Sequence, residues 1–223
     1  MKLIEHPDRE ALTLAVAQDI TSALGMALAT SDRAVLCLPG GSTPVPVFKA
    51  LSAAALDWTR VVIVPGDERW VPADHPRSNA RLIRRNLIDE GATAAELVEL
   101  YGDGLDPEAG AAAASDRVAA LLPLSVLLLG MGEDMHTASL FPGADGLAAA
   151  LAPDAPPVLP IQAEGVDEAR VTLTLPALRS APEMILMIAG PDKRAALDRA
   201  SGLSPDQAPI AAFLKGLVVH YAD

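Results

Sequence analysis

A histidine and an aspartate lie two residues apart in a glycine-rich segment, a spacing that suits an acid–base pair. The segment reads GMGEDMH from Gly130 to His136 and follows an apolar run, Ser125–Leu129, typical of a buried strand. A carboxylate close to an imidazole can orient the ring and tune its pKa for general-base work. A single histidine is more often structural, but a glycine-rich loop after a strand favours catalysis. We therefore predict that His136 is a catalytic base with Asp134 beside it.

A second group of charged residues follows the apolar run Arg60–Val64 and reads GDERW from Gly66 to Trp70. Acids crowded at the end of a strand are costly unless they act on a ligand or are well solvated. The sequence alone leaves both alternatives open for Asp67, whereas Arg69 could capture a phosphate.

Basic residues are concentrated just after this group, although the chain as a whole is acidic. Five of the 17 lysines and arginines lie within residues 69–85. Arg77, close to the start of a predicted helix, could capture a phosphate, and Asn79 beside it could contact the substrate. The other three more simply form one solvated helical face: Arg81, Arg84 and Arg85.

The apolar run Ala34–Leu38 leads directly into the sequence PGGSTP. Glycines let the backbone approach an anion closely, and hydroxyl groups beside a helix start can add hydrogen bonds. The predicted phosphate contacts are Gly40, Gly41, Ser42 and Thr43. An ordinary strand–helix turn with a capping residue explains the same segment equally well. The segment is not a P-loop, since no Gly-Lys-Ser/Thr follows.

Two further basic residues lie next to predicted elements. Arg170 immediately precedes the apolar run Val171–Leu175, and Lys193 lies in the first turn of a predicted helix, Pro191–Ala200. A lysine at the positive end of a helix is disfavoured unless an anion is bound there too. An ordinary exposed lysine fits the sequence as well, but both residues remain candidates for anion binding.

Motifs for several other chemistries are missing from the sequence. Met135 occupies the position of the third glycine in a dinucleotide-binding fingerprint, and neither Gly-x-Ser-x-Gly nor His-Glu-x-x-His occurs. The single cysteine, Cys37, excludes an internal disulfide and a four-cysteine zinc site. The sequence therefore argues against NAD binding and gives no support for a metal-activated water.

Composition narrows the function classes further. The formal net charge is −12, which argues against binding nucleic acid or an anionic membrane. No apolar run approaches the roughly 18 to 20 residues of a membrane span, and the start of the chain lacks the apolar core of a secretory signal. A soluble cytoplasmic protein remains, and we expect a monomer or small homo-oligomer with no nucleic-acid or membrane partner.

The candidate residues lie near the ends of apolar runs that alternate with helical patterns. The predicted strands are Ala34–Leu38, Arg60–Val64, Ser125–Leu129, Val171–Leu175, Met184–Ala189 and Leu217–His220. The predicted helices are Pro7–Leu28, Pro44–Ala54, Ser78–Ile88, Pro107–Leu121 and Pro191–Ala200. This alternation indicates an α/β fold, with a mainly parallel sheet flanked by helices in a Rossmann-like three-layer sandwich. We find no repeat and no convincing linker, so we predict a single domain over residues 1–223.

Together, the loop sequences resemble the glucosamine-6-phosphate isomerase/6-phosphogluconolactonase family, and the lactonases in particular. The segments that carry the resemblance are GGSTP (Gly40–Pro44), DERWVP (Asp67–Pro72), SN (Ser78 and Asn79), GMGEDMHTASLFPG (Gly130–Gly143), RVTLTLPAL (Arg170–Leu178) and GPDKR (Gly190–Arg194). The resemblance implies hydrolysis of 6-phospho-D-glucono-1,5-lactone to 6-phosphogluconate in the oxidative pentose phosphate pathway, without metal or cofactor.

The resemblance also implies roles for single residues. His136 is the base that activates water, Asp67 lies in the same pocket, and either Asp67 or Asp134 orients the imidazole. The residues implied to hold phosphate or sugar oxygens are Gly41, Ser42, Arg69, Arg170 and Lys193. The family usually has glycine where this chain has Met135. A positive φ at that position would strain a methionine by about 1 kcal/mol or more.

Two other functions fit the same loops. Glucosamine-6-phosphate deaminase carries a glutamate a few residues after its Asp-Gly-His triplet, but Thr137–Pro142 contains no acid here, and DERWV fits the lactonases better. A non-catalytic sensor of sugar phosphates would keep the anion-binding residues and could discard the base. The presence of both Asp134 and His136 argues against a sensor.

Overall fold

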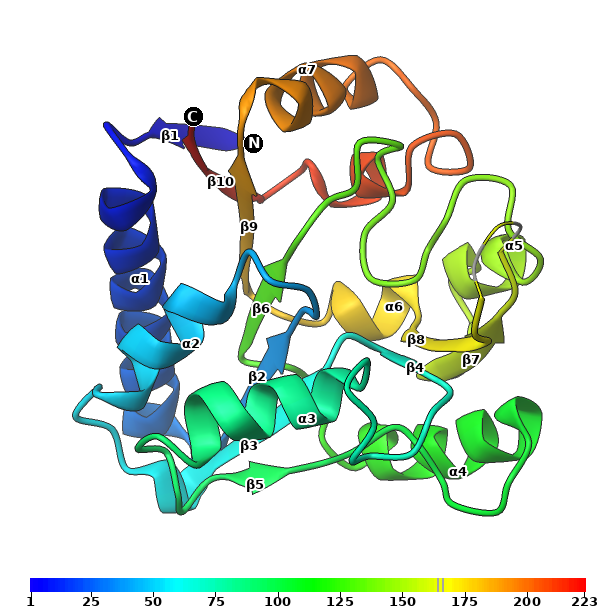
Figure 1. Cartoon of the computed structure of the whole chain (residues 1–223), viewed down its shortest axis with the longest axis horizontal. Coiled ribbons are helices and arrows are strands. Elements are labelled where there is room, and N and C mark those ends of the chain that lie inside the picture. The colour runs from blue at the N-terminus through cyan, green and yellow to red at the C-terminus, as the bar shows by residue number, and fades with distance from the viewer. Residues whose placement is uncertain (164, 166) are drawn as a thin grey trace.

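The computed structural model describes residues 1–163, 165 and 167–223, and within them a seven-stranded parallel sheet forms the centre (Figure 1). In order across the sheet, the strands are β1 (Lys2–Glu5), β10 (Val218–Ala222), β9 (Glu183–Ala189), β6 (Val126–Leu129), β2 (Ala34–Leu38), β3 (Val61–Pro65) and β5 (Glu96–Leu97). Every residue of β2, β3 and β6 is buried. Their continuous apolar sequences follow from this, because both faces of the sheet are covered.

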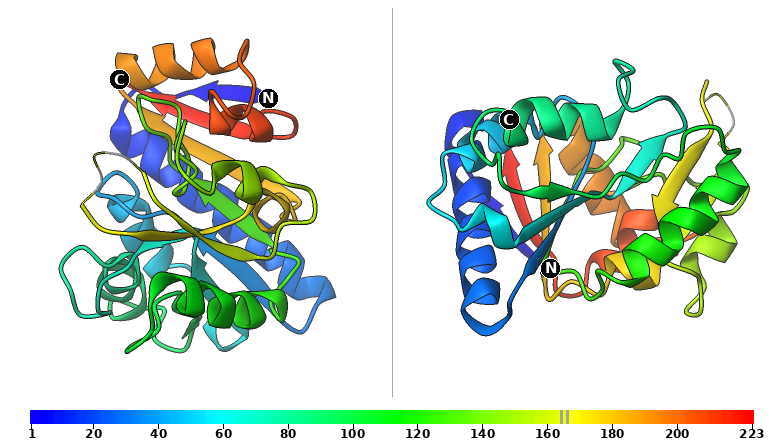
Figure 2. Two further views of the ribbon diagram at one scale, coloured as in Figure 1. Left: turned by 90° about the vertical axis from the view of Figure 1, so that its right-hand side faces the viewer. Right: turned by 90° about the horizontal axis from the view of Figure 1, so that it is seen from below.

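Two apolar cores lie on opposite faces of this sheet. In β2, Val35 and Cys37 join one core, whereas Leu36 and Leu38 join the other. The core of Leu36 packs against α1 (Arg9–Thr30), α2 (Val45–Ser52), α3 (Asn79–Ile83) and the π-helical turn that continues it (Arg84–Ile88). The core of Val35 packs against α4 (Pro107–Ala119), α7 (Pro191–Ala200) and the 3-10 helix Pro209–Phe213. Figure 2 shows the sheet between these layers, so the predicted α/β sandwich is confirmed.

A second, antiparallel sheet lies on the side of α4. Its strands are, in order, β4 (Asp67–Arg69), β8 (Arg170–Leu173) and β7 (Val158–Ile161), and two short helices are close to it, α5 (Leu147–Leu151) and α6 (Leu175–Leu178). The segment Val171–Leu175 was predicted as a strand of the mainly parallel sheet. In the structure it pairs antiparallel with β4 and β7, and the strand ends at Leu173. Pro176, in the first turn of α6, cannot donate to a strand ladder but suits a helix start, which explains why the strand ends early.

The other predicted elements agree with the structure to within two residues at each end. The strands that were not predicted are β1, β4, β5 and β7, which contain two to four residues each. So short a segment shows too little periodicity to be recognised in a sequence.

The longest helix, α1, corrects one expectation. By length and composition it could cross a membrane, contrary to the prediction that no run approaches that length. One side of the helix is buried through residues such as Leu12, Val16 and Ile20, which pack in a core. A helix that covers a core, or a signal sequence near the N-terminus, passes the same test, so this finding is weak ground for a membrane role.

Candidate active site

A cavity of about 380 Å³ lies where the carboxyl ends of β2, β3, β6 and β9 meet. Ligands of α/β proteins bind at this edge of the sheet. The charged and polar side chains that line the cavity are Thr43, Asp67, Arg69, Asn79, His136, Arg170 and Lys193. Its apolar wall includes Leu129, Met131, Phe141, Met187 and Ile188. Segments from most of the chain length thus meet at one place.

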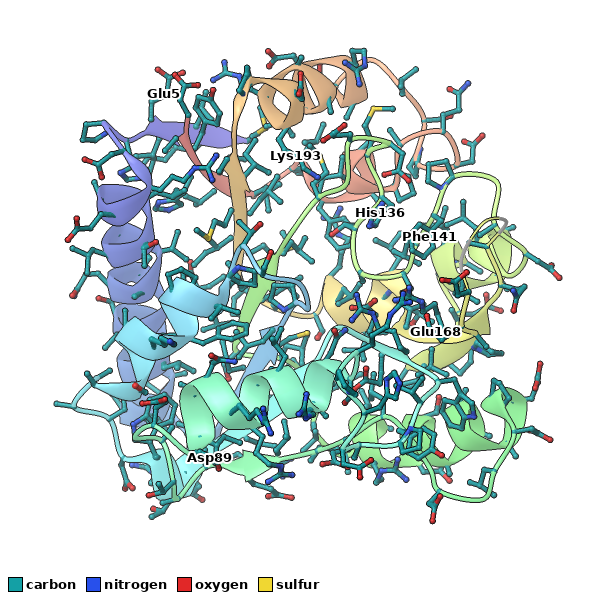
Figure 3. All side chains as sticks on the ribbon, in the orientation of Figure 1. Glu5, Asp89, His136, Phe141, Glu168 and Lys193 are labelled. Carbon is teal, nitrogen blue, oxygen red and sulfur yellow. The ribbon has the colours of Figure 1, made fainter. Side chains whose placement is uncertain are left out.

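The imidazole of His136 is held by one carboxylate oxygen. Asp134 Oδ1 lies 2.5 Å from His136 Nδ1 and accepts a second hydrogen bond from the His136 backbone N–H at 3.2 Å. An ionised carboxylate can only accept, so Nδ1 of a neutral ring carries the proton and Nε2 is left as the acceptor. The ring also packs against Phe141, with 4.4 Å between the ring centroids. Figure 3 shows His136 beside Phe141 in the loop after β6, with Lys193 near the start of α7.

The same pairing keeps the aspartate ionised. Partial burial alone would raise the pKa of Asp134, but the hydrogen bonds and the attraction from His136 outweigh burial and lower that pKa. The carboxylate is therefore available both to orient the ring and to stabilise the imidazolium that forms when His136 takes a proton.

The loop that carries this pair, residues 130–143, contains left-handed backbone. The Gly132 N–H donates to the His136 carbonyl at 2.9 Å, and the Met135 N–H donates to the Gly132 carbonyl at 3.0 Å. Met135 has a φ of 68° and Ala138 a φ of 50°. Side chains in this region cost about 1 to 2 kcal/mol per residue. Met135 therefore has the positive φ that was expected to strain a methionine at this position.

Asp67 lies in the wall of the cavity but is bonded to residues other than His136. Its Oδ2 accepts from the Ser139 hydroxyl at 2.5 Å, and its Oδ1 accepts from Asn79 Nδ2 at 3.2 Å. Of the two acids proposed to orient the imidazole, it is Asp134 that contacts it. Asp67 instead connects the loop of His136 with Asn79.

Two arginines face each other across the antiparallel sheet. Arg69 and Arg170 are cross-strand partners in β4 and β8, where like charges repel. Their Nε atoms are buried and have no hydrogen-bond partner in the described part of the chain. Burial, followed by the charge of Arg69, lowers the pKa of Arg170. An anion bound between the two arginines would relieve the repulsion and accept from unused donors.

Lys193 brings a third positive charge to the cavity. Its Nζ donates to the Met131 carbonyl at 2.6 Å, so the side chain extends from the first turn of α7 to the loop of His136. The predicted basic residues Arg69, Arg170 and Lys193 are thus brought to one cavity from β4, β8 and α7.

The glycines of the PGGSTP segment allow a close approach of the loop to its neighbours. A β-carbon at residue 40 would overlap the amide group of Asn79, so Gly40 is required where the two segments meet. Gly41 has a φ of 88°, which favours glycine. Both glycines line the cavity with Thr43, whereas Ser42 is exposed and lies outside the lining. The structure therefore does not bring Ser42 to the cavity wall, although both of its neighbours line it.

Arg77 and Asn79 were expected to contact the phosphate or the substrate, but both are bonded to other residues of the protein. Arg77 lies outside the cavity lining, because it pairs with Glu168 at 3.0 Å and with Asp167 at 3.5 Å. Asn79 lines the cavity, but its amide nitrogen donates to the Asp67 carbonyl at 2.8 Å as well as to Asp67 Oδ1. With both amide hydrogens used, Asn79 holds Asp67 in position and has none left for a phosphate.

Two fully buried polar residues behind the cavity, Glu68 and Ser139, were not predicted. A signal for Glu68 exists, since alternate residues of a strand point to opposite faces and Asp67 and Arg69 share one face. Ser139 carries no such signal, because its partner Asp67 is 72 residues away in the chain.

Other chemistries find little support in the site. Among residues 1–163, 165 and 167–223, no three His, Cys, Asp or Glu side chains are grouped to hold a metal ion. Burial, reinforced by the charge of Asp67, raises the pKa of the Cys37 thiol, so the thiol remains protonated and is a poor nucleophile.

The chain is similar to known proteins over most of its length. Residues 7–220 match the family described as glucosamine-6-phosphate isomerases/6-phosphogluconolactonase. A 6-phosphogluconolactonase of Rhizobium meliloti (strain 1021) is 43% identical over 219 residues, covering 96% of this chain and 93% of that protein. One from Mesorhizobium japonicum is 44% identical over 211 residues, covering 93% and 88%.

A solved structure agrees with the sequence comparisons. The crystal structure of a 6-phosphogluconolactonase from Shewanella baltica OS155 is similar, with a TM-score of 0.96 and 32% identity over 100% of this chain and 98% of that chain. The loops that form the cavity lie within the residues matched by the family. This chain therefore belongs to the glucosamine-6-phosphate isomerase/6-phosphogluconolactonase family.

Proposed function

We propose that this chain is a lactone hydrolase that converts 6-phospho-D-glucono-1,5-lactone to 6-phospho-D-gluconate in the oxidative pentose phosphate pathway. The observation that carries the proposal is the His136 imidazole, oriented by Asp134 in a cavity that three cations line. A base that activates water and a set of cations are what hydrolysis of a phosphorylated lactone requires.

The phosphate is held by the cations of the cavity. Arg69 and Arg170 offer unused, buried donors, and Lys193 adds a charge close to the loop of His136. Gly40 and Gly41 bring backbone into the cavity wall, where a hydroxyl or phosphate oxygen can approach closely. Since the phosphate is remote from C1, its binding energy can be used to position the carbonyl carbon against the base.

Hydrolysis then needs one proton relay. As water attacks C1, His136 Nε2 takes a proton from it, and the carbonyl becomes a tetrahedral oxyanion. Asp134 stabilises the imidazolium through Nδ1. A positioned donor such as a cation or a backbone N–H stabilises the oxyanion by about 3 kcal/mol. When the tetrahedral intermediate collapses, the bond between C1 and the ring oxygen breaks and His136 returns the proton to that oxygen, which leaves the open-chain acid.

Lactone hydrolysis is favoured over deamination of glucosamine 6-phosphate, the other activity in the family. The segment Thr137–Pro142, directly after His136, contains no carboxylate that could assist opening of a sugar ring. Asp67, which lines the cavity, is already bonded to Ser139 and Asn79.

A direct assay separates the possible activities. Freshly generated 6-phosphogluconolactone is incubated with the protein at mildly acidic pH, where spontaneous hydrolysis is slow, and release of acid is followed. We expect acid release to accelerate and no ammonia to form from glucosamine 6-phosphate. Ammonia without lactonase activity would identify a deaminase, and binding without turnover of either compound would identify a sensor.

We also propose that residues 1–223 act as one domain, since β1 and β10, from the two ends of the chain, pair in the same sheet as the strands that carry the site. A cytoplasmic location and a monomeric or small homo-oligomeric state stay predictions of the sequence.

A further inference from the structure

We propose that Glu68 is a positioning residue that fixes the substrate-binding wall of the cavity from behind, an inference that rests on the proposed function. Glu68 is completely buried, and its two neighbours in β4, Asp67 and Arg69, both line the cavity. Alternate side chains of a strand point to opposite faces, so Glu68 points away from the cavity. Its carboxylate therefore supports the wall and does not touch the substrate.

The carboxylate of Glu68 accepts four hydrogen bonds. Its Oε1 accepts from the backbone N–H groups of Arg69 at 2.8 Å and Asn79 at 2.7 Å. Its Oε2 accepts from the backbone N–H of Ala80 at 2.8 Å and from the Ser78 hydroxyl at 3.0 Å. The three backbone N–H groups can only donate, and the Ser78 hydroxyl completes the set. Burial raises the pKa of Glu68, but the bonds from the N–H groups of Asn79, Ala80 and Arg69 oppose that rise and favour the ionised carboxylate.

These bonds join the wall of the cavity at several points. They attach β4 to the start of α3, and so place Arg69 and Asn79 relative to each other. Asn79 in turn donates to Asp67 and packs against Gly40. The groups that Glu68 positions, directly or through Asn79, thus belong to the PGGSTP segment, β4 and α3.

The acid–base pair is bonded within its own loop, which Glu68 reaches indirectly, through Asn79, Asp67 and Ser139. His136 and Asp134 bond to each other within the loop after β6, and the four hydrogen bonds of Glu68 go to other residues. A defect at Glu68 should therefore weaken substrate binding more than it slows the chemical step. A carboxylate that only stabilised the start of α3 would alter stability and leave binding unchanged.

Two substitutions test the proposal, Glu68→Gln and Glu68→Ala. Glutamine can keep its carbonyl oxygen toward Arg69 and Asn79 while its amide donates to the Ser78 hydroxyl, but the amide then meets the Ala80 N–H donor to donor. Alanine removes all four acceptors. We expect KM to rise a few fold for Glu68→Gln and on the order of tenfold or more for Glu68→Ala. For both variants, kcat should stay within about threefold of the wild-type value, with an unchanged pH profile.

Binding of the product supplies a readout that does not depend on turnover. The dissociation constant of 6-phosphogluconate, measured by titration calorimetry, should rise in parallel with KM. A wild-type protein that binds 6-phosphogluconate without hydrolysing the lactone would refute the proposed function, while the binding comparison would still test Glu68. If Glu68→Ala does not fold, the Glu68→Gln comparison decides.

Ser115→Ala is the matched control. Ser115 is buried and its hydroxyl bonds both the N–H and the carbonyl of Val158 at 2.9 Å, in a part of the fold outside the cavity lining. This variant should lower the melting temperature and leave KM and the product affinity unchanged. Glu68 variants that behave in the same way, or that lower kcat with KM unchanged, would overturn the proposal.

Discussion

At the scale of single residues, the proposed chemistry depends most directly on His136, because Asp134 occupies Nδ1 and leaves Nε2 as the proton acceptor. His136→Ala should lower kcat by about 10²- to 10⁴-fold, the usual contribution of a general base. KM should stay within a few fold, since the cations that bind the phosphate remain in place. Steady-state kinetics with the lactone measure both values, and a nearly fully active variant would show that another group activates the water.

Met135 allows a test of backbone strain at a single position. Its φ of 68° penalises any side chain, whereas its own side chain packs against a core. Met135→Ala and Met135→Gly both lose that packing, but only glycine relieves the strain. The glycine variant should be more stable than the alanine variant by roughly 1 kcal/mol in equilibrium urea denaturation. Equal stabilities would show that the left-handed conformation costs nothing at this position.

Residue types and their positions after strands predicted most of the cavity. His136, Arg69, Arg170 and Lys193 are all brought to it. Ser42 and Arg77 have suitable chemistry as well, but a sequence does not show which way a loop side chain points or that two acids near residue 168 would pair with an arginine. The buried network of Glu68 was not predicted because its partners become neighbours only after β4 meets α3.

At the scale of elements, the loop of residues 130–143 folds tightly only because it contains glycine at a crowded position. A β-carbon at Gly132 would overlap Asp134 Oδ1 and His136 Nδ1, whereas one at Gly130 would meet open space. Gly132→Ala should therefore separate the acid–base pair and lower kcat at least tenfold, by loss of the oriented imidazole.

Gly130→Ala is the control for this prediction, since it adds the same methyl group two residues earlier in the same loop. Gly130 itself lines the cavity, so an added methyl group can raise KM, but kcat should stay close to the wild-type value. Equal losses in the two variants would mean that the loop tolerates no side chain at either position, and that contact with the acid–base pair is not the cause.

The elements that could be predicted are those that carry their own signal. Continuous apolar runs identified β2, β3, β6 and β9, and helix-length patterns with prolines at their starts identified α4 and α7. The antiparallel sheet was not recognised, because β4 is three residues long and pairs with β8 about a hundred residues later in the chain. The sequence near β4 gives no sign of its pairing with β8. That pairing nevertheless decides the site, because it places Arg69 opposite Arg170.

At the scale of the whole molecule, the two ends of the chain meet at one edge of the large sheet, where β1 pairs with β10 (Figure 1). A cluster of three side chains connects this edge with α1. His6 Nε2 lies 3.0 Å from His220 Nδ1, and His220 Nε2 lies 3.1 Å from Asp19 Oδ2. His220 Nε2 is close to Asp19 without hydrogen-bond geometry, so the bond that the structure shows is the one between the two imidazoles. One ring of that bond must accept, and only a neutral imidazole can accept.

The stability of the molecule should therefore fall as the pH drops below the ordinary pKa of histidine, because of His220. Burial, helped by the charges of His6 and Lys2 and opposed by Asp19, lowers the pKa of His220 below 6.5. The unfolded chain then binds more protons than the folded one once the pH falls below about 6.5, whereas above pH 7 neither form binds a proton at this residue.

The melting temperature should be level from pH 7 to 8 and decline toward pH 5. His220→Asn should make that decline shallower. A decline of the same steepness in His220→Asn and in the wild-type protein would show that other groups cause it.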